Sequence, residues 1–176
     1  MIKINLKNSN RPIKIKKKKF LDSRGYFQEI FLKKELNLNV KFTALAKSKK
    51  NVIRGMHFQI KNKQTKLIHV IEGKISDVVI NLKKSSKNFG KVSKFILNEG
   101  DLLFIPKHFA HGYECLSSKC IVLYHLENYR DPKNECGIQY NDKKLKINWN
   151  SKKPILSFRD RNNISFDEFK KKYKTI

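Results

Sequence analysis

Residues 100–111, GDLLFIPKHFAH, combine a turn, an apolar run and a histidine at fixed spacing. Gly100 ends the turn signal Asn98-Glu99-Gly100, and the apolar run after it is typical of a β-strand. Five residues separate Gly100 from Pro106, and His111 comes five positions after Pro106. The stretch therefore predicts a strand and, beyond Pro106, a histidine on the strand that follows.

Similar short runs occur along most of the chain. They are rich in β-branched and aromatic residues and are separated by turn signals such as Glu72-Gly73 and Ser117-Ser118. The predicted strands are residues 51–58, 65–73, 74–82, 92–99, 101–106 and 120–127. Six closely spaced strands predict an all-β fold, a sandwich or barrel.

Helix is predicted in two places only. One is a short piece near residues 31–37, and the other is the C-terminal segment 165–176, where Ser165 and Glu168 form a capping-box pattern. Residues 1–19 are predicted to be an edge strand or an N-terminal arm. With no long linker, residues 1–176 are expected to form one domain.

The composition is that of a globular protein with one core. The chain has 176 residues, of which 39% are hydrophobic and 11% aromatic. The N-terminus has no secretory apolar segment, and no later run reaches the length of a membrane span. Three cysteines without a CxxC pair suit a reducing compartment. We expect a soluble cytoplasmic protein that does not contact membranes.

The net charge of +25 raises the question of nucleic-acid binding. The basic residues are 34 lysines and only 6 arginines, and they are spread along the whole chain. This pattern favours a solvated lysine surface over a nucleic-acid-binding protein, although such a surface still attracts anionic ligands.

Two predicted hairpins place polar side chains together. Pairing about Glu72-Gly73 sets Ile68 opposite Asp77, so Lys66 and Asp77 become diagonal neighbours on one face. Pairing about Ser117-Ser118 sets His111 opposite Tyr124. A charged pair on a strand is usually solvated, and a His–Tyr pair is often plain packing. The same pairs can also line a proton-transfer pocket.

The spacing of Gly100, Pro106 and His111 resembles the second motif of the cupins, with His108 at a position where that motif usually has glycine. The resemblance implies a jelly-roll β-barrel or sandwich with short flanking helices. In a metal-binding cupin the first motif supplies an HxH pair. Here that region carries His57 alone, with Gln59 at the second ligand position, so no metal is expected.

Further motifs narrow this resemblance to one family. The runs DSRGYFQE, IRGMHFQ, TKLIHVIEGKISDVVINL, IPKHFAHGY, VLYHLENY, GIQYND and PILSFRD stand in this order between residues 22 and 160. In order and spacing they resemble the dTDP-4-dehydrorhamnose 3,5-epimerase family, the metal-free branch of the cupins. That family inverts C3 and C5, or C3 alone, of nucleotide-linked 4-keto sugars without a cofactor, usually as a homodimer.

The resemblance implies a role for each matching residue. His57 corresponds to the base, Asp160 to the carboxylate that orients it, Tyr124 to the acid on the opposite face, and Lys66 to the cation that stabilises the enolate. The positions implied for substrate binding are Arg24, Glu29, Arg54, Gln59, Asp77, His111, Arg130, Glu135 and Arg159. In the family the N-terminal segment, here with Arg24 and Glu29, can serve the neighbouring subunit's site.

Arg54 and His57 present a geometric difficulty. On a regular strand, residues three apart point to opposite faces, yet both match pocket positions. Glycine tolerates the extra residue of a bulge, so we predict an irregularity at Gly55.

The residues that correspond to the nucleotide-binding part of the family's site depart from the family pattern. Residues 43–46, Thr-Ala-Leu-Ala, replace a polar run, and Arg130 replaces an aromatic residue that stacks on thymine. An arginine can still stack on a base. A related branch acts on GDP-linked 4-keto heptoses for capsule sugars, and this interpretation slightly favours that branch over dTDP-4-keto-6-deoxyglucose.

Three other functions compete with the epimerase hypothesis. A nucleotide-sugar 3,4-ketoisomerase shares the scaffold but usually lacks the C-terminal ILSFRD element. A non-catalytic module would bind sugar nucleotides or nucleic acid without solvent exchange at C3. A metal-dependent oxygenase fits least, because the HxH pair is missing.

Overall fold

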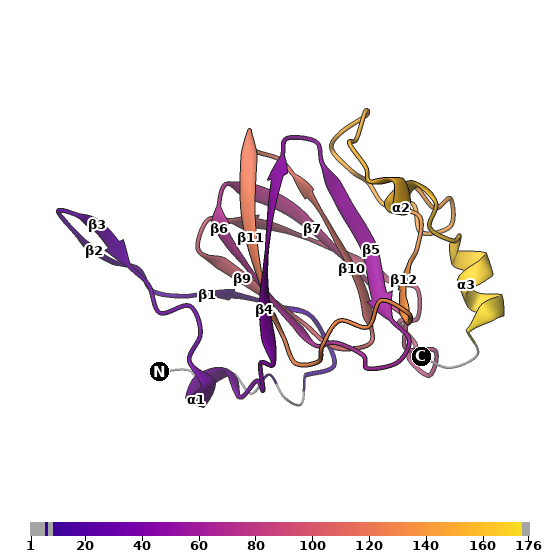
Figure 1. Ribbon diagram of the computed structural model, residues 1–176, viewed down its shortest axis with the longest axis horizontal. Coiled ribbons are helices and arrows are strands. Elements are labelled where there is room, and N and C mark those ends of the chain that lie inside the picture. Colours follow the sequence, from indigo (N-terminus) through magenta and orange to yellow (C-terminus); the bar gives the residue numbers. More distant parts are fainter. Residues whose placement is uncertain (1–5, 7–8, 174–176) are drawn as a thin grey trace.

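The strands form two five-stranded antiparallel sheets that face each other (Figure 1). The computed structural model describes residue 6 and residues 9–173. The first sheet has the order β1 (Ile13–Lys16), β9 (Asp101–Ile105), β6 (Lys66–Glu72), β11 (Lys119–Leu126) and β4 (Phe42–Lys49). The second has the order β12 (Glu135–Gly137), β5 (Ile53–Gln59), β10 (Phe109–Cys115), β7 (Lys74–Asn81) and β8 (Val92–Asn98). The all-β jelly-roll prediction is confirmed.

Both predicted hairpins are wrong. β6 pairs with β9 and β11, whereas β7 pairs with β8 and β10, so the corner at Gly73 carries the chain from one sheet to the other. The turn at Ser117-Ser118 does the same between β10 and β11. Lys66 and Asp77, like Tyr124 and His111, therefore lie on opposing sheets. A short turn does not distinguish a hairpin from a sheet-to-sheet corner.

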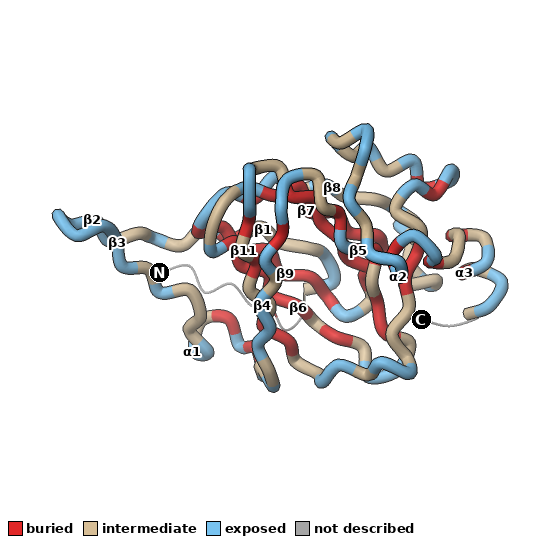
Figure 2. The backbone as a smooth tube through the Cα atoms, turned by 45° about the horizontal axis from the view of Figure 1, so that its top comes forward, coloured by how far each residue is buried: buried red, intermediate tan, exposed pale blue. Residues whose placement is uncertain are grey.

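Three apolar clusters hold the layers together. One lies between the sheets and includes Ile68 and Val122 from the first sheet and Val79 from the second, all fully buried. A second covers the outer face of the second sheet. The third, which includes Leu6 and Leu36, covers part of the outer face of the first. Figure 2 shows the buried strands between exposed surface segments.

Three short helices lie outside the sheets. α1 (Lys33–Leu36) and α3 (Phe166–Lys172) confirm the two predicted helices, and the Ser165–Glu168 capping box is present. Positions 174–176 of the predicted C-terminal helix lie outside the described residues. α2 (Phe158–Arg161) was not predicted, because a four-residue helix has too few turns to show an apolar period. No helix in the described part of the chain is long and apolar enough to cross a membrane.

The described part of the N-terminal segment is partly a strand and partly a projecting hairpin. β1 pairs with β9 at the edge of the first sheet, as the edge-strand reading predicts, while positions 1–5 and 7–8 lie outside the described residues. β2 (Phe20–Asp22) and β3 (Gly25–Phe27) form a separate exposed hairpin that points away from the body (Figures 1 and 2).

The predicted irregularity at Gly55 is present. His111 of β10 pairs with His57, and Tyr113 pairs with Arg54, so β5 has one residue more than β10 between these pairs. Gly55 has φ +145°, and the Gly55–Met56 peptide bond is cis. A Cβ atom on Gly55 would lie 2.5 Å from the Gly112 Cα atom. Two facing glycines thus admit the bulge and leave Arg54 and His57 on the same inner face.

We expect Gly55→Ala to destabilise the fold by roughly 3 kcal/mol, because the methyl group adds overlap with Gly112 to an unfavourable φ. Urea unfolding followed by fluorescence measures the loss. Gly25→Ala is the matched control, since Gly25 has φ +132° but no atom within 4 Å of the added Cβ atom. Equal losses for the two variants would contradict the steric explanation.

Candidate active site

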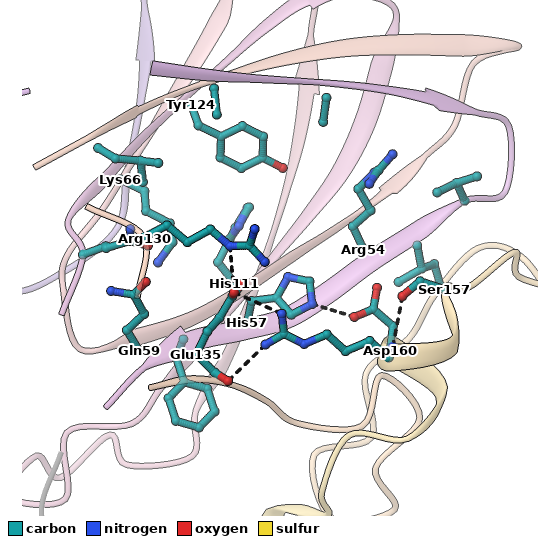
Figure 3. Close-up of a pocket in the computed structure, with 18 of the residues that line it drawn as sticks. Arg54, His57, Gln59, Lys66, His111, Tyr124, Arg130, Glu135, Ser157 and Asp160 are labelled. Atoms are coloured by element: carbon teal, nitrogen blue, oxygen red, sulfur yellow. Dashed lines mark hydrogen bonds and ion pairs between the residues drawn. The ribbon is translucent and has the colours of Figure 1, made fainter. Parts of the chain in front are cut away.

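A cavity of about 480 Å³ opens between the two sheets and is bounded on one side by the segment leading into α2 (Figure 3). Its size is that of a small-molecule site. The polar lining residues are Arg54, His57, Gln59, Gln64, Lys66, His111, Tyr124, Arg130, Glu135, Ser157, Arg159 and Asp160. Most of the residues that sequence analysis implies for the site therefore meet in one place.

His57 and Asp160 form a hydrogen-bonded pair on one wall. His57 is on β5 and Asp160 is in α2, 103 residues away, with 2.6 Å between Nε2 and Oδ1. The carboxylate is almost fully buried, with 4% of its residue surface exposed. Burial alone would raise the pKa of Asp160, but the hydrogen bond and charge of His57 outweigh burial, and the pKa is lowered. An ionised Asp160 accepts a hydrogen bond from His57 Nε2 and so fixes the orientation of the imidazole ring.

Local contacts fix the position of Asp160. Ile155 forms a parallel bridge with Val52, just before β5, so the chain enters α2 beside His57. Ser157 is the N-cap of α2, and its hydroxyl accepts a hydrogen bond from the Asp160 backbone N–H at 3.1 Å. Sequence analysis missed Ser157, although the spacing Ser157-x-x-Asp160 is an N-cap signal.

Tyr124 stands on the opposite wall, on β11 of the first sheet. Its ring meets the His111 ring edge to face, with 6.1 Å between centroids. Burial raises the pKa of Tyr124 well above its ordinary value, and neighbouring Tyr113 and Asp77 add to the shift. The phenol therefore keeps its proton at neutral pH and faces the cavity as a donor.

His111 is backed by a second carboxylate. Its Nε2 atom lies 2.8 Å from Asp77 Oδ2, and Asp77 is fully buried behind the cavity wall. Burial raises the pKa of Asp77, with His111 opposing the shift. Asp77 therefore contacts the cavity only through His111 and is not adjacent to Lys66 as the predicted hairpin requires.

Lys66 brings a buried cation to the cavity. It begins β6, and 7% of its residue surface is exposed. Burial lowers the pKa of Lys66 from 10.5 to about 8, and the negative charge of Glu135 limits this shift. The ammonium group is therefore charged at neutral pH and weakly solvated, so an oxyanion placed beside it would be strongly stabilised.

Glu135 joins two arginines at one side of the cavity. Its Oε2 atom lies 2.9 Å from Arg130 Nε and 3.0 Å from Arg159 Nη1. Burial would raise the pKa of Glu135, but the two guanidinium groups outweigh burial and lower it. Gln59 also lines the cavity, yet its side chain bonds the backbone of Asn62, Tyr129 and Asp131. Gln59 thus orders the loop that carries Arg130.

Arg24 and Glu29 do not line the cavity. Arg24 belongs to the turn of the projecting β2–β3 hairpin, where its guanidinium bonds Asp22 at 2.6 Å. Glu29 is exposed just beyond that hairpin. Within one chain these two residues are separate from the other implied site residues.

The residues with described positions include no group of three or more His, Cys, Asp or Glu side chains arranged to hold a metal ion. The two cavity histidines are instead each bonded to one carboxylate. Ala44 and Ala46 line the cavity from β4, so the run that departs from the family pattern forms a small, apolar part of the wall.

A family model described as dTDP-4-dehydrorhamnose 3,5-epimerase matches residues 10–168 of the chain. The chain belongs to this family. Its members are isomerases, so the protein is an enzyme of that class, a nucleotide-sugar epimerase.

Individual relatives agree with this assignment. The dTDP-4-dehydrorhamnose 3,5-epimerase of Methanothermobacter thermautotrophicus is 37% identical over 153 residues, which is 81% of this chain and 83% of that protein. The crystal structure of the Bacillus anthracis epimerase with TDP and pyrophosphate bound has a TM-score of 0.86 at 34% identity, covering 94% and 98% of the two chains. The crystal structure of a Legionella pneumophila epimerase in complex with dTDP-4-keto-L-rhamnose has a TM-score of 0.84 at 30% identity, covering 91% of each chain.

We expect the Lys66 ammonium group to titrate near pH 8, against an ordinary value of 10.5. NMR of lysine labelled with ¹³C at Cε measures this pKa, with Lys66→Met to assign the resonance. Glu135→Gln should lower the pKa further, because it removes the charge that opposes the shift. A Lys66 resonance that titrates at the ordinary value would contradict burial as the cause.

Proposed function

We propose that the enzyme inverts C3 and C5, or C3 alone, of a nucleotide-linked 4-keto sugar through an enolate. The observation that carries this proposal is the position of a base and an acid on opposing sheets. His57, backed by Asp160, lies on the second sheet, and Tyr124 lies on the first. Inversion of a carbon requires removal of a proton from one face and its return to the other.

The proposed reaction has two proton transfers. His57 Nδ1 removes the proton from the carbon next to the C4 ketone, and the imidazolium is stabilised by Asp160. Negative charge develops on the C4 oxygen beside the Lys66 ammonium group. The Tyr124 hydroxyl then donates its proton to the opposite face of the same carbon. These steps require no redox change.

The nucleotide is proposed to be dTDP. The Methanothermobacter, Bacillus and Legionella relatives are all named as dTDP-sugar epimerases, and the Legionella structure contains a dTDP-4-keto sugar. Ala44, Ala46 and Arg130 motivate the GDP-linked 4-keto heptose interpretation, which no comparison supports. Both nucleotides belong in the same assay.

The active form is proposed to be a homodimer in which the β2–β3 hairpin reaches the partner's cavity. The hairpin extends from the body and exposes Leu21 by 80% and Phe27 by 66% (Figure 1). Apolar side chains on an exposed projection favour burial against another chain. In that arrangement Arg24 and Glu29 would act on the partner's nucleotide.

The proposed location is the cytoplasm. The three cysteines Cys115, Cys120 and Cys136 are free thiols, and two of them are buried. Free thiols are usual in a reducing compartment.

We expect deuterium from D2O to enter the substrate at C3, with or without C5, when the enzyme is mixed with a dTDP-linked 4-keto sugar. Proton NMR follows the loss of the C3 and C5 signals, and the GDP-linked sugar is assayed in parallel. His57→Asn should slow exchange by about a thousandfold, because the base is lost. Nucleotide binding, measured by calorimetry, should remain.

Tyr124→Phe should behave differently from His57→Asn. Exchange at C3 should survive, since His57 can still remove the proton, while formation of the inverted product falls by about a hundredfold or more. No effect on product would show that Tyr124 is not the acid. If the wild-type protein binds the sugar nucleotide without hydrogen exchange, a non-catalytic module is favoured instead. If the product carries its carbonyl group at C3 instead of C4, a 3,4-ketoisomerase is favoured.

We expect the double substitution Leu21→Asp and Phe27→Asp to give a monomer in sedimentation equilibrium. Arg24→Ala should leave the dimer intact but raise KM for the nucleotide sugar about tenfold or more, because a charge-assisted bond to phosphate is lost. Arg11→Ala is a matched control, since Arg11 is exposed and does not line the cavity. Wild-type protein that sediments as a monomer would contradict the proposed homodimer, in which the β2–β3 hairpin reaches the partner's cavity.

A further inference from the structure

A second cavity, of about 490 Å³, lies outside the active site. Its lining comes from the N-terminal segment, the residues before β4 and β6, the end of β9 with the corner that follows it, and the residues after β11. Among the residues that the structure describes, the two cavities share no lining residue. The volume is that of a small-molecule site, and the proposed epimerase reaction does not use it.

A short stretch of chain before β6 separates the two cavities. Lys63 and Thr65 line the second cavity, whereas Gln64 and Lys66 line the active site. Side chains thus alternate between the two cavities along this stretch, as they alternate between the two faces of a strand. The second cavity is therefore a separate site on the other side of the chain that carries Lys66.

Basic side chains gather around this second cavity. Lys41, Lys63, Lys107 and His108 line it, against a single carboxylate, that of Glu127. One oxygen of that carboxylate already accepts a hydrogen bond from a backbone N–H of the segment before β4, at 2.9 Å. In the described part of the chain, the lysines that form ion pairs are all outside the cavity: Lys14, Lys17, Lys19, Lys119, Lys144 and Lys170. The cavity therefore has an excess of positive charge.

His108 supplies an independent observation. Its Nδ1 atom is buried and has no hydrogen-bond partner among the described residues, whereas His57 and His111 each bond a carboxylate. Burial lowers the pKa of His108, and the positive charges of Lys63 and Lys107 lower it further. A buried polar atom without a partner is unfavourable, and so is a gathering of like charges. Both would be relieved by a ligand that brings negative charge.

The rest of the lining is partly apolar. Leu38, Phe104 and Pro106 line the cavity, and the first two have only 2% of their surface exposed. An apolar floor with a few polar groups at one side is typical of sites for small organic molecules. Lysine binds phosphate as a point charge, without the paired geometry that arginine imposes. The lining therefore fits a phosphate group better than a planar carboxylate.

We propose that this cavity binds a phosphate group, either free or carried by a small molecule, on Lys63, Lys107 and His108. The bound anion takes the place of the carboxylate that these side chains lack. Leu38 and Phe104 contact the organic part of the ligand, so a phosphate ester should bind more tightly than inorganic phosphate. The inference does not depend on the proposed epimerase reaction.

Proton NMR of the histidine rings tests this site directly. The chain has five histidines, and His108→Gln assigns the His108 signal. The protein is titrated with inorganic phosphate, with thymidine monophosphate and with sodium chloride at equal ionic strength. We expect both phosphates to shift the His108 signal saturably and to raise its pKa, because a bound anion stabilises the imidazolium. Signals of His57 and His111 report binding in the active site separately.

A matched pair of double variants separates the site from the overall charge. Lys63→Met with Lys107→Met should weaken phosphate binding at His108 about tenfold or more, because two charged hydrogen-bond donors are lost. Lys152→Met with Lys153→Met removes the same charge from two exposed lysines outside the cavity, and binding should stay within about twofold of wild type. Thermal unfolding confirms that both variants fold.

The outcomes distinguish a built site from general charge screening. Saturable binding at His108 that only the cavity variant loses supports the inference. Tighter binding of thymidine monophosphate identifies the ligand as a phosphate ester, and tighter binding of inorganic phosphate identifies the free anion. A response that chloride reproduces at equal ionic strength would overturn the inference. Equal weakening in the two double variants, or no response of His108 to either phosphate, would overturn it as well.

Discussion

The site depends on one extra residue in β5. His57 and Arg54 are register partners of His111 and Tyr113, which are two residues apart on β10 and point to the same face. Without the bulge between them, either His57 or Arg54 would turn to the outer face of the sheet. The bulge in turn requires that Gly55 and Gly112 lie in contact, where a Cβ atom on either residue would overlap its neighbours. The His57 and Arg54 side chains therefore reach one cavity because of this glycine pair.

The sandwich supplies the second requirement, a cavity with polar side chains on two opposing walls. The second sheet carries His57 and His111, and the first carries Tyr124 and Lys66. The chain has 40 basic and 15 acidic residues. Each of three carboxylates near the cavity bonds one or two particular basic side chains. Asp160 bonds His57, Asp77 bonds His111, and Glu135 bonds two arginines. These acids fix tautomers and side-chain positions, while the surrounding positive charge attracts an anionic substrate.

Strand periodicity identified the inward-facing residues even where the predicted pairing was wrong. Lys66 and Tyr124 point into the interior because strand side chains alternate, and this holds whichever strand lies alongside. Periodicity does not show which strand pairs with which, because the short turn at Gly73 is compatible with a hairpin or with a corner between sheets. β4 was not predicted, since its FTALAKSK sequence has one β-branched residue and five of its eight residues are exposed. The position of β4 is set by its pairing with β11 in the folded sheet and not by a pattern in its own sequence.

The sequence by itself, through its local patterns and its resemblance to a known family, determined the jelly-roll class, the family, the irregularity at Gly55 and most of the residues that meet in the cavity. It did so because glycine at a strand interior, alternation along strands and motif spacing are local properties of the chain. Only the tertiary structure decided that Asp160 reaches His57 through a four-residue helix, and that Ser48 joins Arg54 to Tyr113. These contacts link residues on separate elements, up to 103 positions apart, and their hydrogen bonds depend on how the two sheets pack rather than on any local pattern.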